Sequence, residues 1–440
     1  MECAHLARYS WVDLAFSVVG VCTFLVDWGS DVWVAAELYG RGDVLWCAVL
    51  VGLMALSSVV VQTFSWFWFQ YDRELVPRAA EAGVPGHSVV MFGGRVKLSC
   101  LLHVLQLGFL CRHFWVIWRG FRVWWRKEDG SEYAVYLTHD LSMLRLIETF
   151  CESAPQLTLM LYVMLQTNKA RTVQFVSIAA STTSMAWMVV DYHRSLRSFV
   201  PDKAKQSWSS SVVYFFWNLL LISPRVASLA LFSSVLSSFV ALHFALLWVA
   251  FVAWVWLQRT DFMDSAGGEW LYRATVGLIW YFSWFNVTEG GTRGRSLIYH
   301  SFITVDCAIL LTTWWLYRDP VASGSYSVAL AVSLPLVYVC GLLLKTFYYV
   351  CFHPKLWRPT QRDPGLPEDV PDDRGPDDRG PDDRGPDDRG PDSEVTFRDM
   401  SAQGGGLSQP LVNKRMALLA SNFYSERESA ASWKRKEWNV

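Results

Sequence analysis

The sequence predicts an all-α membrane protein, with eight transmembrane helices and two half-inserted helices arranged in two structural repeats, followed by a disordered acidic C-terminal tail. Three observations predict this class: the composition, ten long apolar segments, and the positions of basic residues between those segments. Hydrophobic side chains make up 52% of the 440 residues and charged ones only 18%. This balance departs from that of soluble domains towards that of membrane proteins.

Ten segments are apolar over a length close to that of a membrane helix. A hydrocarbon core about 30 Å thick requires about 20 residues of α-helix. The segments are residues 11–39, 44–71, 97–118, 141–166, 172–196, 208–236, 239–258, 270–287, 297–316 and 325–352. The first one lacks the basic flank and the small-residue cleavage site of a signal peptide, so we expect it to remain as a membrane helix.

Two of the ten segments carry basic residues on both flanks. Segment 97–118 lies between the basic loops 72–97 and 119–137, and the short segment 270–287 lies between two further basic stretches. Because short cytoplasmic loops are rich in Lys and Arg, one crossing helix cannot satisfy both flanks. We therefore expect these segments to enter the membrane and return to the same side. The order is then two spans, one half-helix and two spans, repeated once, with both termini in the cytoplasm.

This order divides the chain into three parts. Residues 1–206 form an N-terminal membrane repeat and residues 207–355 a C-terminal one, related by an axis along the membrane normal. Residues 356–440 form a cytoplasmic regulatory tail that contains four copies of PDDRG at 371–390. Those copies have no apolar side chains to bury apart from proline, so disorder is expected. Residues 413–430 show helical spacing with basic neighbours and would dock on the membrane domain or on lipid.

Several charged residues lie inside the apolar segments. The stretch "VDLAFSVVGVCTFLVDWGSD" (12–31) contains Asp13, Asp27 and Asp31, whose spacing places them roughly on one stripe of a helix. A charge at the centre of a membrane helix costs roughly 2.5–3.5 kcal/mol. Further charges of this kind are Glu148, Glu152, Asp191, Arg225 and Asp306.

These charges allow two interpretations. They could form ion pairs that hold helices together, for example Asp27 or Glu148 with Arg225. They could instead form a continuous polar track across the bilayer, which the excess of acids over bases favours. An ion channel or solute transporter would enclose such a track, whereas a lipid scramblase would leave it open sideways. A membrane partner protein with no transport of its own is a third alternative.

The sequence contains no motif for covalent chemistry or for ATP use. It has no GxxxxGK[ST], GxSxG or HExxH pattern, and its nine His and nine Cys residues are dispersed without ligand spacing. We therefore expect no enzyme activity, cofactor, metal site or disulfide framework. The net charge of −1 gives no indication of nucleic-acid binding.

The charged stretches resemble the XK-related family over about residues 10–355. The resemblance rests on "FLVDWGSDVW", "FSWFW", "SMLRLIETFCESAPQLTLMLYVMLQ", "DYHRSLR", "VYFFWNLLLISPRVASLALF", "TDFM", "EWLYR" and "YFSWFNVTEGGTRGR". Within the family, the chain is most similar to the caspase-activated phospholipid scramblase member, which the tail segment "NKRMALLASNFY" also resembles. The resemblance implies calcium-independent exposure of phosphatidylserine at the plasma membrane of apoptotic cells, after caspase cleavage of the tail. It also implies a single-pass immunoglobulin-type chaperone, basigin or neuroplastin.

On this resemblance, nine membrane residues acquire expected roles. Trp46 would close the outer mouth of the path, although its alternative is an ordinary interfacial aromatic residue. The predicted headgroup track consists of Asp13, Asp27, Asp31, Glu148, Glu152, Asp191, Arg225 and Asp306.

The expected caspase site lies in the tail. Executioner caspases favour DxxD before a small residue, and the only such spacing there is "DVPD" (369–372), followed by the unfavourable Asp373. We expect cleavage after Asp372 first, with Asp392 and Asp369 as further candidates. An alternative is that the acidic repeats are a spacer and that phosphorylation activates the protein.

Overall fold

The computed structural model describes residues 9–81, 95–126, 131–167, 172–198, 206–263, 265–287, 292–320, 324 and 326–352. Throughout these ranges the regular structure is helical and no strand occurs, which confirms the all-α class. The helices are α1 (Trp11–Gly40), α2 (Val44–Glu81), α3 (Val96–Val104), α4 (Gly108–Arg126), α5 (Ser131–Cys151), α6 (Ser153–Thr167), α7 (Thr172–Ser198), α8 (Trp208–Val235), α9 (Ser237–Leu257), α10 (Ala266–Phe282), α11 (Thr292–Tyr317), α13 (Ser327–Phe347) and the π-helix η3 (Tyr348–Phe352). The predicted tail and its three candidate cleavage residues lie outside the described residues.

Six of these helices are long and apolar enough to cross a membrane, which indicates a multi-pass membrane protein. They cover Trp11–Gly40, Val44–Arg73, Trp208–Val235, Ser237–Leu257, Gly294–Tyr317 and Ser327–Cys351. The other two predicted spans correspond to α5–α6 and α7. These helices contain buried polar residues such as His139, Arg145 and Asp191. Such side chains lower the hydropathy of a helix that lies inside the bundle rather than against lipid.

The predicted segment 141–166 is interrupted once. Helix α5 ends at Cys151 and α6 begins at Ser153, so Glu152 lies at the junction. Pro155 has no N–H group to donate to the carbonyl of Cys151, which explains the break. Backbone hydrogen bonds continue on either side, from Glu152 N to Glu148 O at 2.8 Å and from Gln156 N to Glu152 O at 3.1 Å.

Both segments predicted to be half-inserted contain a break in the helix. Helix α3 ends at Val104 and α4 begins at Gly108, and between them Gln106 adopts a left-handed backbone conformation with φ of 63°. In the second half, α10 ends at Phe282 and is followed by the non-helical residues 283–287. A break of this kind is needed for a segment to enter and return. The eight-span count and the two repeats remain predictions.

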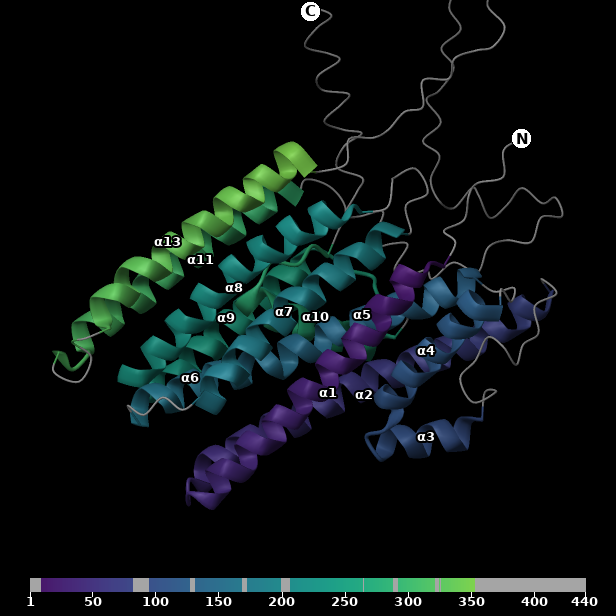
Figure 1. Ribbon diagram of the computed structural model, residues 1–440, viewed down its shortest axis with the longest axis horizontal. Helices are drawn as coiled ribbons and strands as arrows, with labels where there is room; N and C mark the ends of the chain where they lie inside the picture. Colours follow the sequence, from purple (N-terminus) through teal and green to yellow (C-terminus); the bar gives the residue numbers. More distant parts are fainter. Residues whose placement is uncertain are drawn as a thin grey trace, which may run out of the picture. The chain divides into compact units, whose positions relative to one another are not determined.

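The core lies among the central helices. Figure 1 shows α5, α7, α8 and α10 in the middle of the bundle, with α11 and α13 along one flank and α1 to α4 along the other. In the most apolar stretch of α8, 61% of residues are buried, against 11% for α9. Helix α8 is therefore a core helix that packs against neighbours, whereas most of α9 presents apolar side chains to its surroundings.

Candidate functional site

Four carboxyl groups from two parts of the chain come together beside α1. Asp27 and Asp31 lie one helical turn apart on α1. Glu148 lies near the end of α5, and Glu152 lies four residues later at the α5–α6 junction. All four side chains are buried, with 2–6% of their residue surface exposed. Glu148 interacts electrostatically with each of the other three. We call these four residues the acid cluster.

Serine hydroxyl groups contact two members of the acid cluster, Asp27 and Glu152. Ser153 donates a hydrogen bond to Oδ2 of Asp27 at 2.5 Å, and Ser181 donates to its Oδ1 at 3.0 Å. Ser57 forms a hydrogen bond with Glu152. Among the residues that the structure describes, no ion pair joins Asp27, Glu148 or Glu152 to Lys, Arg or His. Arg145 interacts electrostatically with Glu148, but it forms its ion pair with Asp191.

The acid cluster borders a cavity of about 350 Å³, to which Glu148 and Glu152 contribute wall residues. The remaining lining residues are Phe24, Leu25, Trp28, Met54, Ser58, Val61, Gln62, Leu105, Gln106, Leu107, Phe109 and Leu110. Leu25 is 45% exposed, Trp28 51% and Leu105 56%, so this wall belongs to the outer surface of the bundle. We call this space the acid-lined cavity. It has apolar side chains on its outer side and carboxylates on its inner side.

The turn between α3 and α4 is attached to α2 at one edge of the acid-lined cavity. The Gln62 side chain donates to the carbonyl of Gln106 at 2.9 Å and accepts from the N–H of Phe109 at 3.2 Å. Ser58 donates to Oε1 of Gln106 at 2.7 Å. Backbone groups of a non-helical turn at membrane depth require such partners. Neither Ser58 nor Gln62 was predicted from the sequence, although Gln62 is an isolated amide in the apolar run "VVVQTF".

A second group of charges is centred on Arg145, which joins three other helices. Its guanidinium donates to Oδ2 of Asp191 on α7 at 2.9 Å, to the carbonyl of Ser17 on α1 at 2.8 Å and to His113 on α4 at 3.3 Å. An ion pair therefore balances Asp191. Asp13 lies at the start of α1, where its carboxylate accepts from the backbone N–H of Ser10 at 2.8 Å in a capping box.

A third group lies in the second half of the chain. Arg225 on α8 is fully buried and forms an ion pair with Oδ2 of Asp306 on α11. His243 on α9 approaches the other carboxylate oxygen, Oδ1, at 3.0 Å, and it also contacts the Tyr281 hydroxyl at 2.9 Å. Arg225 therefore pairs with Asp306, and the pairing with Asp27 or Glu148 considered from the sequence is wrong. Arg225 and Asp306 are 81 residues apart in the sequence, so helical periodicity could not predict that they pair.

Trp46 lies near the start of α2 and is partly buried. Its ring packs edge-on against Tyr162 with a centroid distance of 4.9 Å, beside an apolar cluster that includes Val34, Leu38 and Leu50. This position is compatible with a gate and with an ordinary interfacial aromatic residue, so its role remains a prediction.

The eight residues of the predicted headgroup track thus fall into distinct settings. Asp27, Asp31, Glu148 and Glu152 form the acid cluster, of which Glu148 and Glu152 line the cavity. Asp191, Arg225 and Asp306 are held in ion pairs, and Asp13 belongs to the capping box of α1. Within the described ranges, no group of three or more His, Cys, Asp or Glu side chains has the arrangement of a metal site.

The chain is similar to known proteins over most of its length. A family profile described as XK-related protein matches residues 15–354. The chain is 67% identical over 426 residues to XK-related protein 8 of Gasterosteus aculeatus, which covers 97% of this chain and all of that protein. It is 64% identical to XK-related protein 8 of Tetraodon nigroviridis, over 98% of this chain and all of that protein. It is 40% identical to XK-related protein 8 of Pan troglodytes, over 96% of each.

Proposed function

The chain belongs to the XK-related family, and from this membership and the acid-lined cavity we propose that it is a phospholipid scramblase. It would expose phosphatidylserine at the cell surface during apoptosis, without ATP or calcium. The observation that carries the proposal is a cavity with buried carboxylates on one wall and exposed apolar side chains on the other. That arrangement suits a molecule with a polar head and apolar chains.

The residues of the cavity support a mechanism in which only the lipid headgroup passes along the protein. The whole lipid would not have to enter a closed pore. Glu148 and Glu152 are carboxyl groups that form no ion pair with a base among the described residues. The ammonium groups of phosphatidylserine, phosphatidylethanolamine and phosphatidylcholine carry the complementary charge. The acyl chains would stay in hydrocarbon beside Leu25, Trp28 and Leu105 while the headgroup contacts the carboxylates.

The proposed topology adds two spans to the six apolar ones. Helices α5–α6 and α7 would cross the membrane inside the bundle, and the α3–α4 and α10 segments would enter and return. Both termini would then lie in the cytoplasm of a plasma-membrane protein. The acidic tail would be cut by a caspase, after Asp372 or else after Asp392 or Asp369. The loss of segment 413–430 would then release the resting state. Basigin or neuroplastin would deliver the protein to the cell surface.

Liposomes that contain the purified full chain test the activity. Fluorescent phosphatidylcholine in both leaflets is exposed to external dithionite before and after caspase treatment. With the resting protein, we expect dithionite to bleach about half of the fluorescence, which is the share in the outer leaflet. With the cleaved protein, we expect it to bleach nearly all of the fluorescence, because scrambling brings inner-leaflet lipid to the outside. Ion flux without extra bleaching would identify a channel or transporter instead. The absence of both signals after cleavage would favour a partner protein without transport activity.

The cleavage site has a separate test in cells. Asp372→Ala should abolish annexin staining after an apoptotic stimulus if the cut after this residue activates the protein. Normal staining in Asp372→Ala, together with a loss of staining in Asp392→Ala or in Asp369→Ala, would assign activation to cleavage after the residue whose replacement abolishes staining. Normal staining in all three variants would favour activation by phosphorylation.

A further inference from the structure

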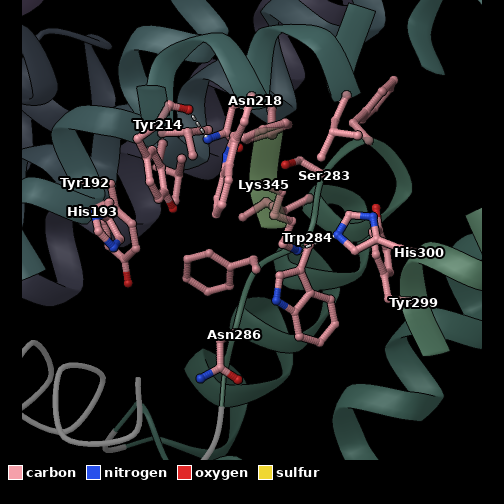
Figure 2. Close-up of a pocket in the computed structure, with 18 of the residues that line it drawn as sticks. Tyr192, His193, Tyr214, Asn218, Ser283, Trp284, Asn286, Tyr299, His300 and Lys345 are labelled. Carbon is pink, nitrogen blue, oxygen red and sulfur yellow. Dashed lines mark hydrogen bonds between the residues drawn. The ribbon is translucent and has the colours of Figure 1, made fainter. Parts of the chain in front are cut away.

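A second cavity, of about 60 Å³, lies among α7, α8, α11, α13 and the non-helical residues 283–287 (Figure 2). It shares no lining residue with the acid-lined cavity. Tyr192, Tyr214, Trp217, Trp284 and Tyr299 form much of its wall, and none of its lining residues is Asp or Glu. We call it the aromatic cavity. Its charge character is the reverse of that of the acid-lined cavity.

The cation of the aromatic cavity is Lys345 on α13. Its ammonium group donates to Oγ of Ser296 at 2.8 Å and contacts Nε2 of His300 at 2.6 Å. No ion pair joins Lys345 to a carboxylate within the described part of the chain.

Two buried polar side chains in the aromatic cavity also lack a partner. Asn286 is 8% exposed, and neither its Oδ1 nor its Nδ2 atom forms a hydrogen bond in the described structure. The indole Nε1 of Trp217, a residue that is 4% exposed, is likewise without an acceptor there. Leaving such a group unsatisfied costs about 1–3 kcal/mol. Figure 2 shows Lys345 beside Trp284 and His300, with Asn286 on the non-helical segment below them.

We propose that the aromatic cavity binds a phosphate group, supplied either by an anionic phospholipid or by free phosphate. Lys345 supplies the positive charge, and the N–H groups of Trp217 and Asn286 supply hydrogen bonds that no protein acceptor uses. A volume of about 60 Å³ accommodates roughly four to six atoms the size of a water oxygen, and a phosphate group has five heavy atoms. The site is independent of the acid-lined cavity and does not rest on the proposed scrambling.

Thermal unfolding of the purified full chain in detergent tests this binding. The probes are dihexanoylphosphatidic acid, inorganic phosphate and zwitterionic dihexanoylphosphatidylcholine, each titrated separately. We expect phosphatidic acid to raise the melting temperature in a saturable way, because a ligand that binds only the folded state stabilises it. A similar rise with inorganic phosphate would identify free phosphate as a source, and a rise with phosphatidic acid alone would identify a lipid.

Lys345→Met should weaken the apparent affinity for phosphatidic acid at least about tenfold, which corresponds to the loss of about 1.4 kcal/mol. Lys97→Met, at an exposed lysine on α3, is the matched control and should leave the affinity unchanged. Asn286→Leu provides a second variant if Lys345→Met does not fold. The proposal is overturned if phosphatidylcholine stabilises the wild-type chain equally, if no phosphate probe stabilises it, or if the variants in the aromatic cavity bind as the control does.

Discussion

The acid cluster and the Arg225–Asp306 group both place charges inside apolar helices, but they treat those charges differently. Arg225 and Asp306 neutralise each other, and His243 occupies the second carboxylate oxygen. In the acid cluster, serine hydroxyls contact Asp27, and Glu148 and Glu152 border a cavity at the bundle surface. The difference between the two groups is that Arg225 and Asp306 form an ion pair in the core, whereas Glu148 and Glu152 line a cavity without an ion pair among the described residues. We expect the paired charges to contribute mainly to stability and the cavity carboxyl groups mainly to activity.

The largest expected effect is a loss of stability when the Arg225–Asp306 ion pair is broken. Arg225→Met leaves the Asp306 carboxylate without its guanidinium partner, and breaking a buried pair in this way costs about 3–5 kcal/mol of unfolding free energy. Thermal unfolding of the purified variant measures the loss. The double variant Arg225→Met/Asp306→Leu should recover part of it, since no uncompensated charge remains. A single variant as stable as the wild type would show that the pair is not structural.

A substitution at Gly20, which lies against the Arg145 guanidinium, tests whether the ion-paired Arg145 group also contributes to stability. A methyl group at Gly20 would overlap the Arg145 guanidinium, which three hydrogen bonds hold in place. Gly20→Ala should therefore lower the unfolding free energy by about 1–3 kcal/mol, as overpacking does. Gly29→Ala on the same helix is the matched control, because its added methyl group meets nothing within 4 Å. Equal melting temperatures for the two variants would contradict the close approach of Arg145 to α1.

For the acid cluster, we expect a substitution to reduce lipid scrambling and not stability. Glu152→Gln keeps the shape of the side chain but removes its charge, so it should slow lipid scrambling by about tenfold, or about 1.4 kcal/mol. Its melting temperature should not fall, because the change removes repulsion among neighbouring carboxylates. Dithionite bleaching and thermal unfolding of the cleaved protein measure the two quantities. Asp43→Asn, in the loop between α1 and α2, is the control and should scramble normally. Normal scrambling by Glu152→Gln would separate the acid cluster from transport.

The smallest expected effect concerns the lipid itself. If the acid cluster attracts ammonium groups, fluorescent phosphatidylcholine should be scrambled several-fold faster than phosphatidylglycerol, which has no amine. A factor of about five corresponds to about 1 kcal/mol, a modest value for charges that share a wet cavity. The rates are compared in liposomes of identical composition apart from the labelled lipid. Equal rates would show that the carboxylates do not recognise the amine.

Much of the helical architecture could be predicted from periodicity and hydropathy alone. Segment 11–39 coincides with α1 and segment 208–236 with α8, because long apolar runs have few alternatives to a helix. The break inside 97–118 could also be anticipated, since polar residues and basic flanks interrupt it. The separation of α5 from α6 at Glu152 is a finer feature. Pro155 signals the freed carbonyl, but not how the neighbouring helices use the junction.

The sequence by itself determined the all-α class, the multi-pass character and the presence of charges within apolar helices. It also placed Asp27 with Asp31 and Glu148 with Glu152, because residues four apart share a helix face. The tertiary structure alone decided which of these faces meet. Asp27 contacts Ser153 and Ser181, which are 126 and 154 residues away, and Arg225 contacts Asp306, which is 81 residues away. Helical periodicity determines the direction in which a side chain points around the axis of its helix. Which residue it contacts depends on how helices that are distant in the sequence pack together.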